Sequence, residues 1–136
     1  MTLKWASIIV DSHDIAAQGR WWAETLGWVV QYESDDEVEI APAPTAQTQG
    51  AADGAPFTLG YTGPTIEFVP VPEGKTVKNR LHIDLAPRAG DDQAAEVERL
   101  LARGASRSSI GQGPDETWVV LADPEGNEFC VLSPRD

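Results

Sequence analysis

Alternating apolar and polar residues, interrupted by one helical stretch, fill the first half of the chain. Residues 4–10 (KWASIIV) are rich in β-branched side chains and predict a strand. The apolar spacing over Ile15–Leu26 predicts a helix, with Asp14 as its N-cap and Gly27 directly after its end. Further strands are predicted over residues 28–32, 37–41, 57–61 and 65–69.

The second half of the chain repeats this order of elements. Residues 80–85 (RLHIDL) predict a strand, and a helix is expected from Asp91 or Asp92 to about Arg103. Strands then follow over residues 106–110, 117–121 and 129–132, the last after a DPEGNE turn. By contrast, residues 42–56 are rich in Pro, Ala, Gly, Gln and Thr without any period and predict a mobile loop.

The two halves are related by a faint internal repeat. Asp14 and Asp91 are 77 positions apart, and so are the helix-closing Gly27 and Gly104. The order predicts one α+β domain of two βαβββ modules, at about residues 1–72 and 77–136. Because each module alone leaves a sheet edge open, we expect the two to pair in a curved mixed sheet around a cleft.

Composition and charge narrow the possible partners. A length of 136 residues suggests a single domain. The formal net charge of -12 repels phosphate backbones and anionic lipids, so we expect neither nucleic acid nor a membrane as a partner. No basic leader or membrane-length apolar run is visible. Cys130, the single cysteine, excludes an intramolecular disulfide and fits a reducing compartment, so we expect a cytoplasmic protein.

Strand alternation selects the side chains that would line the cleft in the second half. In residues 80–85 the apolar positions Leu81, Ile83 and Leu85 are expected to face the helix. Arg80, His82 and Asp84 then share the opposite face. His82 suits a ligand, a general base or a substrate hydrogen bond, or is a structural histidine held by Asp84. We expect Arg80 and Asp84 either to form an ion pair with each other or to contact the small molecule.

The same reasoning applies to residues 4–10, where Ala6, Ile8 and Val10 would face the core. Trp5, Ser7 and Ile9 would then face the cleft. Trp5 offers a ligand a flat apolar wall with one N–H donor, or simply fills the sheet. Trp118 fits the cleft and the core equally well, and Cys130 is interpreted first as a small buried hydrophobe. Glu128 is a cleft carboxylate or, because it adjoins a turn, a solvated group, and we expect the second.

Three stretches resemble the glyoxalase/bleomycin-resistance (vicinal oxygen chelate) superfamily, in its glyoxalase-like subgroup. They are VDSHDIAAQGRWWAETLG at residues 10–27, KNRLHIDL at 78–85 and VLADPEGNEFCVL at 120–132. The order of elements resembles that family over the whole chain except residues 42–56. The resemblance implies a small-molecule cleft and a two-fold homodimer.

In metal-using members of that superfamily, four cleft-facing positions bind a divalent ion, usually as His and Glu. Carried over by position, the resemblance puts Ser7, Glu67, His82 and Cys130 at these places. Ser7 is a poor ligand and Cys130 a soft one, whereas catalytic zinc sites usually have three protein ligands. We therefore assign no metal ligand set and no certain cofactor. The sequence leaves open whether a divalent metal binds.

Two functions follow from these residues. The broken ligand set favours a protein that binds or sequesters an aromatic or cationic small molecule without metal, which tryptophans and an acidic surface suit. The alternative is a metal-dependent lyase or isomerase acting beside a carbonyl, with His82 as base or ligand and Glu67 as ligand or second carboxylate. A domain that only mediates assembly is a third interpretation, and the sequence leaves open whether the protein is an enzyme.

Overall fold

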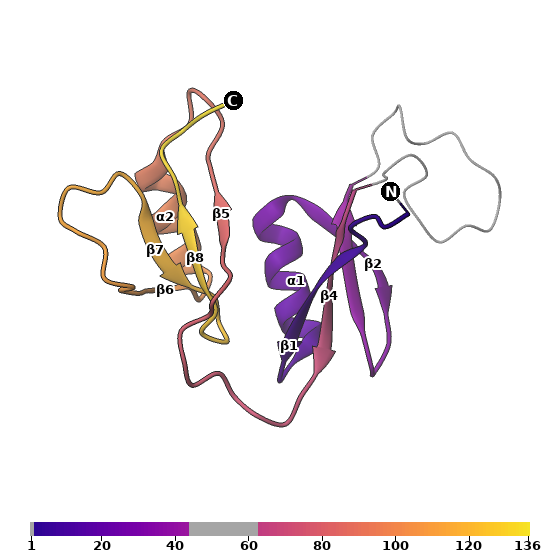
Figure 1. Ribbon diagram of the computed structural model, residues 1–136. Coiled ribbons are helices and arrows are strands. Elements are labelled where there is room, and N and C mark those ends of the chain that lie inside the picture. The colour runs from indigo at the N-terminus through magenta and orange to yellow at the C-terminus, as the bar shows by residue number, and fades with distance from the viewer. Residues whose placement is uncertain (1, 44–62) are drawn as a thin grey trace. The chain divides into compact units, whose positions relative to one another are not determined.

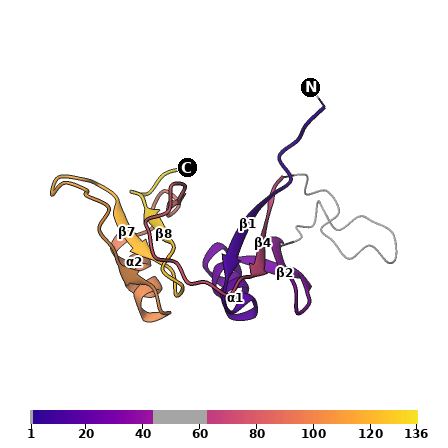
Figure 2. The ribbon, with the colours of Figure 1, turned by 60° about the horizontal axis from the view of Figure 1, so that its bottom comes forward.

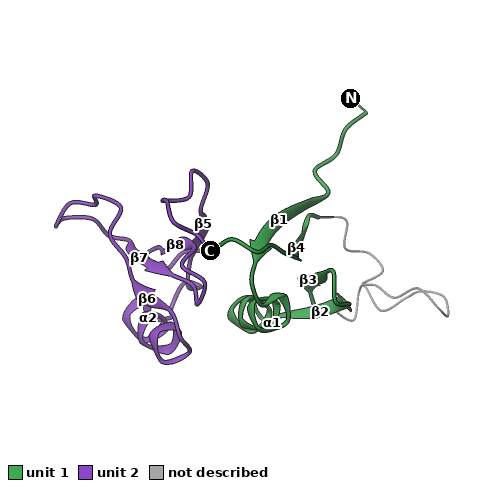
Figure 3. Cartoon of the chain, turned by 90° about the horizontal axis from the view of Figure 1, so that it is seen from below, with its two compact units in different colours: residues 1–74 green, residues 75–136 purple. Residues whose placement is uncertain are grey.

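The computed structural model describes residues 2–43 and 63–136 (Figure 1). The chain divides into two compact units, unit 1 at Met1–Gly74 and unit 2 at Lys75–Asp136 (Figure 3). Within the described residues, each unit holds a strand, a helix and three more strands, which confirms the predicted α+β class with two βαβββ modules. The strand expected over residues 57–61 lies outside the described residues, as does most of the loop expected over 42–56.

The described part of unit 1 forms a four-stranded mixed sheet with one helix. Its elements are β1 (Ser7–Ser12), α1 (Ile15–Leu26), β2 (Trp28–Glu33), β3 (Val38–Pro42) and β4 (Thr65–Pro70). The strand order is β1-β4-β3-β2, in which β1 and β4 run parallel and the other neighbours antiparallel. Figure 2 shows β1 and β4, which are far apart in the sequence, lying side by side.

Helix α1 begins and ends where its capping residues predict. The Asp14 carboxylate accepts a hydrogen bond from the backbone N–H of Ala17 at 3.0 Å, which satisfies a donor in the first turn. Gly27 follows the helix with a φ of 67°, a left-handed conformation that costs glycine little. The sequence therefore determines both ends of α1 locally.

The core of unit 1 lies between α1 and one face of the sheet. Alternate residues of β3 and β4 are buried there: Val38, Ile40, Ile66 and Phe68. A Cβ atom at Gly19 would lie 2.5 Å from Cγ1 of Val38, so the glycine lets the helix approach the sheet closely. Trp21 and Trp22 are both buried and contact each other edge to face with ring centroids 5.1 Å apart.

Unit 2 repeats this arrangement with shorter strands. Its elements are β5 (Ile83–Leu85), α2 (Gln93–Ala102), β6 (Ser106–Arg107), β7 (Val119–Ala122) and β8 (Glu128–Val131). The order β5-β8-β7-β6 matches that of unit 1 strand for strand. Asp92, rather than Asp91, caps α2 by accepting hydrogen bonds from the backbone of Ala94 and Ala95. Of the described helices, neither is long and apolar enough to cross a membrane.

The turn between β7 and β8 forms as predicted. The buried Asp123 carboxylate accepts hydrogen bonds from the backbone N–H groups of Glu125 and Asn127, at 2.9 and 3.0 Å. Gly126 has a φ of 93°, which the turn requires. This hairpin fixes the register between Leu121 and Phe129.

Two strands begin later than the sequence pattern predicts. β1 starts at Ser7 because its partner β4 starts at the paired residue Thr65, and Ala6, predicted to face the core, is exposed. β5 starts at Ile83, and Leu81, predicted to face the helix, is 88% exposed. The reason lies at Asn79, whose backbone and side chain are held by the side chains of the β7–β8 hairpin instead of by a strand ladder.

Candidate functional site

One residue from each strand of unit 1 lies in a row across the sheet. Ile9 on β1 is paired with Glu67 on β4, and Glu67 with Glu39 on β3. Glu39 is paired in turn with Tyr32 on β2. Side chains of directly paired residues project from the same face of a sheet, so these four share the face opposite α1. We call Ile9, Glu67, Glu39 and Tyr32 the acidic row.

The acidic row combines negative charge with accessible apolar surface. Ile9 is 52% exposed and Tyr32 46% exposed, while Glu39 and Glu67 are half-buried. Just before β3, Glu37 adds a third carboxyl group. Burial raises the pKa of Glu37, and the charges of Glu67 and Glu39 and a side-chain hydrogen bond with Glu67 raise it further. The face therefore concentrates carboxylates that repel one another.

Two residues predicted to line the cleft lie at the start of β1. Ser7 is half-buried, and because it is two residues from Ile9 it is on the face of the acidic row. Trp5 precedes the strand and is 65% exposed, and its indole N–H donates to the carbonyl oxygen of Ser7 at 3.2 Å. The one donor of Trp5 is thus used within the chain, and its ring remains accessible.

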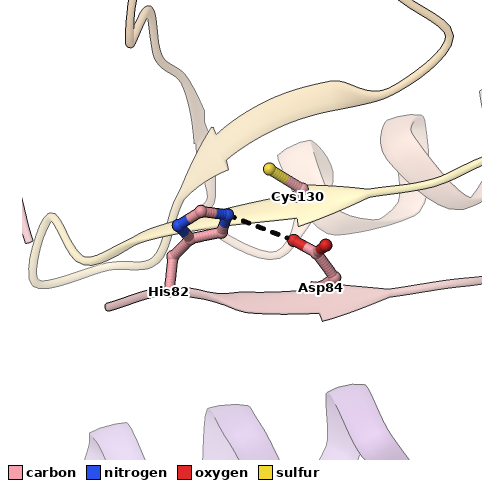
Figure 4. Close-up of side chains that lie close together, drawn as sticks. All are labelled: His82, Asp84 and Cys130. Atoms are coloured by element: carbon pink, nitrogen blue, oxygen red, sulfur yellow. Dashed lines mark ion pairs between the residues drawn. The ribbon is translucent and has the colours of Figure 1, made fainter. Parts of the chain in front are cut away.

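Three predicted site residues meet in unit 2, His82 directly before β5, Asp84 on β5 and Cys130 on β8 (Figure 4). Asp84 and Cys130 are directly paired in the parallel ladder, and His82 precedes Asp84 by two residues. One ligand atom from each side chain, a nitrogen, an oxygen and a sulfur, lies within 4.8 Å of the other two. We call these residues the His82–Asp84–Cys130 cluster.

The His82–Asp84–Cys130 cluster is open on one side and buried on the other. The Nε2 atom of His82 lies 3.3 Å from Oδ1 of Asp84, with side-chain exposures of 36% and 50%. Cys130 is 3% exposed. Burial raises the pKa of the Cys130 thiol, as do the charge of Asp84 and a hydrogen bond with it, while the Lys78 charge acts in the opposite sense. The thiol is therefore protonated and a weak nucleophile at neutral pH.

The remaining predicted residues are more dispersed. Arg80 is exposed and precedes β5, and Asp84 is paired with His82 rather than with Arg80. Trp118 is half-buried and directly precedes β7. Glu67 belongs to unit 1 and His82 to unit 2.

A half-buried ion pair in unit 2 corrects the expectation for Glu128. Its carboxylate lies 2.7 Å from Nζ of Lys75 and accepts the backbone N–H of Asn79 at 3.0 Å, so it is not solvated. Burial alone would raise the pKa of Glu128, but the hydrogen bonds from Lys75 and Asn79 outweigh it, and the pKa is lowered. The pair attaches residues 75–79 to the β7–β8 hairpin.

Sequence reasoning missed Tyr32, Glu37 and Glu39. The alternation E-V-E-I over residues 37–40 was a usable signal, since Val38 and Ile40 face α1 and the two acids must face away. The position of Tyr32 carries no such signal, because it depends on an irregularity in the ladder between Val30 and Tyr32.

Comparisons with known proteins agree with this architecture. The model of a family described as a glyoxalase-like domain matches residues 7–132. No curated protein sequence matches the chain. Members of this fold family bind small molecules or act as metal-dependent enzymes.

Several solved structures share the fold at low sequence identity. A glyoxalase/bleomycin resistance protein/dioxygenase family enzyme from Burkholderia phytofirmans PsJN is 15% identical with a TM-score of 0.64, covering 94% of this chain and 96% of that one. The fosfomycin resistance protein FosX from Listeria monocytogenes is 12% identical with a TM-score of 0.64, covering 98% and 93%. The bleomycin-binding protein from Streptomyces verticillus is 15% identical with a TM-score of 0.53, covering 98% of each chain. Since the family match spans nearly the whole chain, the protein belongs to the glyoxalase-like family within the glyoxalase/bleomycin-resistance (vicinal oxygen chelate) superfamily.

Proposed function

We propose that this protein binds a cationic small molecule with an apolar or aromatic part, without a metal, on the face of unit 1 that carries the acidic row. The observation that supports this best is the pairing of Glu67 with Glu39 between exposed Ile9 and Tyr32. Like charges directly opposite each other destabilise a sheet. A bound cation would relieve that repulsion, which gives the face a reason to prefer positive ligands.

The neighbours of the two carboxylates suit the rest of such a ligand. Tyr32 offers a ring face whose contact with a cation stabilises by about 0.5–1 kcal/mol at an exposed site. Ile9 offers apolar surface on the other side of the row. The formal net charge of -12 attracts cations toward the protein as a whole. A bleomycin-binding protein among the structural neighbours is a precedent for binding on this fold.

Calorimetric titration with benzyltrimethylammonium, and with benzyl alcohol as an uncharged aromatic comparison, tests the proposal. We expect the cation alone to bind, and we expect Glu39→Gln and Glu67→Gln each to weaken it about tenfold, which corresponds to about 1.4 kcal/mol. Glu24→Gln removes the same charge from α1 and serves as the matched control. Equal binding of the alcohol, or equal weakening by Glu24→Gln, would contradict the proposal.

A metal-dependent lyase or isomerase acting beside a carbonyl is the second candidate, and the His82–Asp84–Cys130 cluster favours it. The donor set fits a zinc-like ion, because three protein ligands of N, O and S type are what catalytic zinc sites use. A metal held there would supply polarisation of a substrate oxygen. In this candidate His82 is a ligand, whereas Glu67 belongs to unit 1 and is not part of the cluster. Metal content after purification, measured beside turnover of carbonyl substrates, separates it from the first.

The proposal includes a two-fold homodimer in the cytoplasm, which binds neither nucleic acid nor membrane. Closed two-fold dimers are the commonest soluble oligomers, and a chain with one buried cysteine is suited to a reducing compartment. Light scattering after size-exclusion chromatography should give twice the 14.7 kDa mass of the chain. A mass equal to one chain would remove the dimer from the proposal.

A further inference from the structure

We propose that His82, Asp84 and Cys130 bind a soft divalent cation of the zinc, cobalt or cadmium type in a site that is complete within unit 2. This inference rests on the second candidate function and narrows it to a class of ion and a ligand set; the three ligands all belong to unit 2, and none of them belongs to the acidic row. It also differs from the ligand set that the family resemblance implies. Asp84 becomes a ligand, and Ser7 and Glu67 of unit 1 are not needed.

The backbone brings the three side chains together without any contribution from unit 1. Asp84 and Cys130 are partners in the parallel ladder between β5 and β8, so their side chains leave the sheet on one face. His82 is two residues before Asp84, and Figure 4 shows its ring pointing toward Asp84. Cys130 is fixed by burial, which provides one rigid point for a site whose other two ligands are accessible to solvent.

The distances agree with a tetrahedral ion. With bonds of about 2.3 Å to sulfur and about 2.0–2.1 Å to nitrogen or oxygen, the ligand atoms of such a site lie about 3.3–3.6 Å apart. The distance from His82 Nε2 to Asp84 Oδ1 is 3.3 Å, and ligand atoms of all three residues lie within 4.8 Å of one another. Small rotations of the exposed His82 and Asp84 side chains would bring the remaining distances between ligand atoms into this range.

The chemistry of the ligands selects the class of ion. A thiolate and an imidazole favour zinc, cobalt and cadmium over magnesium and calcium, which prefer oxygen ligands. A Cys130 thiolate and the Asp84 carboxylate together neutralise a divalent charge, and the thiol proton passes to solvent on binding. Lys78 is near enough for its charge to act on Cys130 and opposes the cation. Three protein ligands leave a fourth position for water or a small molecule.

The contrasting arrangement is a plain His82–Asp84 ion pair beside a buried thiol that binds no metal. Titration of the full-length protein with Co²⁺ distinguishes the two, because a cobalt–thiolate bond produces a near-ultraviolet charge-transfer band. We expect one Co²⁺ per chain with that band, displaced by Zn²⁺ and not by Mg²⁺. Absence of the band, or binding that Mg²⁺ reverses, would overturn the proposal.

Matched variants test each ligand separately. Asp84→Asn and His82→Ala should each weaken zinc binding by at least tenfold, since loss of even an outer-shell partner costs about 10–100-fold. Asp91→Asn, an exposed carboxylate of unit 2, and His13→Ala, the other histidine, should leave it unchanged. Cys130→Ala should abolish the cobalt band. Because Asp84 is exposed, Asp84→Asn remains a test of the site even if Cys130→Ala does not fold. Zinc binding that Asp84→Asn leaves intact would refute the proposal.

Discussion

At the scale of single residues, Glu128 and Glu37 show that the surroundings of a glutamate carboxyl group can shift its pKa in either direction. Glu128 is half-buried beside Lys75, and the donors around it lower its pKa. Glu37 lies beside Glu67 and Glu39, and burial and repulsion raise its pKa. The two groups therefore contribute to folding stability with opposite dependence on pH.

Replacing Glu128 should weaken the fold most at neutral pH. Glu128→Gln removes the charge from a hydrogen bond and leaves the Lys75 ammonium group without this opposite charge. The change should lower the free energy of unfolding by about 1–3 kcal/mol. Because the folded pKa is below the ordinary 4.5, this contribution is present above pH 4.5 and is lost as the pH falls through the folded pKa. Urea denaturation over the acid range measures it. Parallel pH profiles for variant and wild type would exclude this role.

Replacing Glu37 should have the opposite sign. Its folded pKa is above 4.5, so the folded state keeps a proton that the unfolded state has lost, and stability falls as the pH rises from 4.5 through the folded pKa. Glu37→Gln should therefore raise the unfolding free energy at neutral pH, with no gain well below pH 4.5. The same denaturation series checks this, and Glu24→Gln on α1 is its charge-matched control. A gain of equal size at all pH values would count against repulsion as the cause.

Among single residues, the caps were the most predictable from sequence and the site partners the least. Asp14 and Gly27 act through backbone groups a few positions away, so a local pattern was sufficient. The ion pair of Glu128 depends on Lys75, 53 positions away along the chain, and no local pattern contains it. For this reason the expectation of a solvated Glu128 was wrong.

At the scale of elements, the contact between α1 and the sheet of unit 1 depends on Gly19. A Cβ atom there would lie 2.5 Å from Cγ1 of Val38 and 3.6 Å from Phe68. Gly19→Ala should therefore destabilise by about 1–3 kcal/mol through overpacking, although alanine favours a helix by about 1 kcal/mol. Thermal unfolding measures the net effect. The double variant with Val38→Ala should lose less stability than the sum of the single variants.

Additive effects of Gly19→Ala and Val38→Ala on the free energy of unfolding would mean that the two residues do not interact as described.

The ends of the strands depend on pairing between segments that are distant in the sequence. β1 and β5 begin where their partners β4 and β8 allow pairing, and the alternation in residues 4–10 and 80–85 does not contain that information. Helix ends were predicted closely because helices cap themselves, whereas strand ends are set by distant residues.

At the scale of the whole molecule, the two units repeat one fold and differ in chemistry. The orders β1-β4-β3-β2 and β5-β8-β7-β6 are equivalent, and they agree with the two repeated modules that the sequence predicted. The paired first and last strands carry Ile9 with Glu67 in unit 1 and Asp84 with Cys130 in unit 2. Fold class was thus predictable from periodicity, while the grouping of the site residues required the register.

The net charge of the chain leads to a prediction at this scale. With a formal charge of -12, the field of the protein should strengthen cation binding, so affinity for benzyltrimethylammonium should fall steadily as salt is raised. Calorimetric titrations at several sodium chloride concentrations measure the slope. Benzyl alcohol should not bind at any of these salt concentrations, and a salt-independent affinity for the cation would contradict an electrostatic site.

Backbone and side-chain NMR can decide whether the acidic row of unit 1 binds a cation. On titration with benzyltrimethylammonium, resonances of Ile9 and Tyr32 should shift in the wild type and in Glu24→Gln. In a variant carrying both Glu39→Gln and Glu67→Gln they should stay in place. Shifts confined to unit 2, or shifts that persist in the double variant, would show that the acidic row is not the cation site.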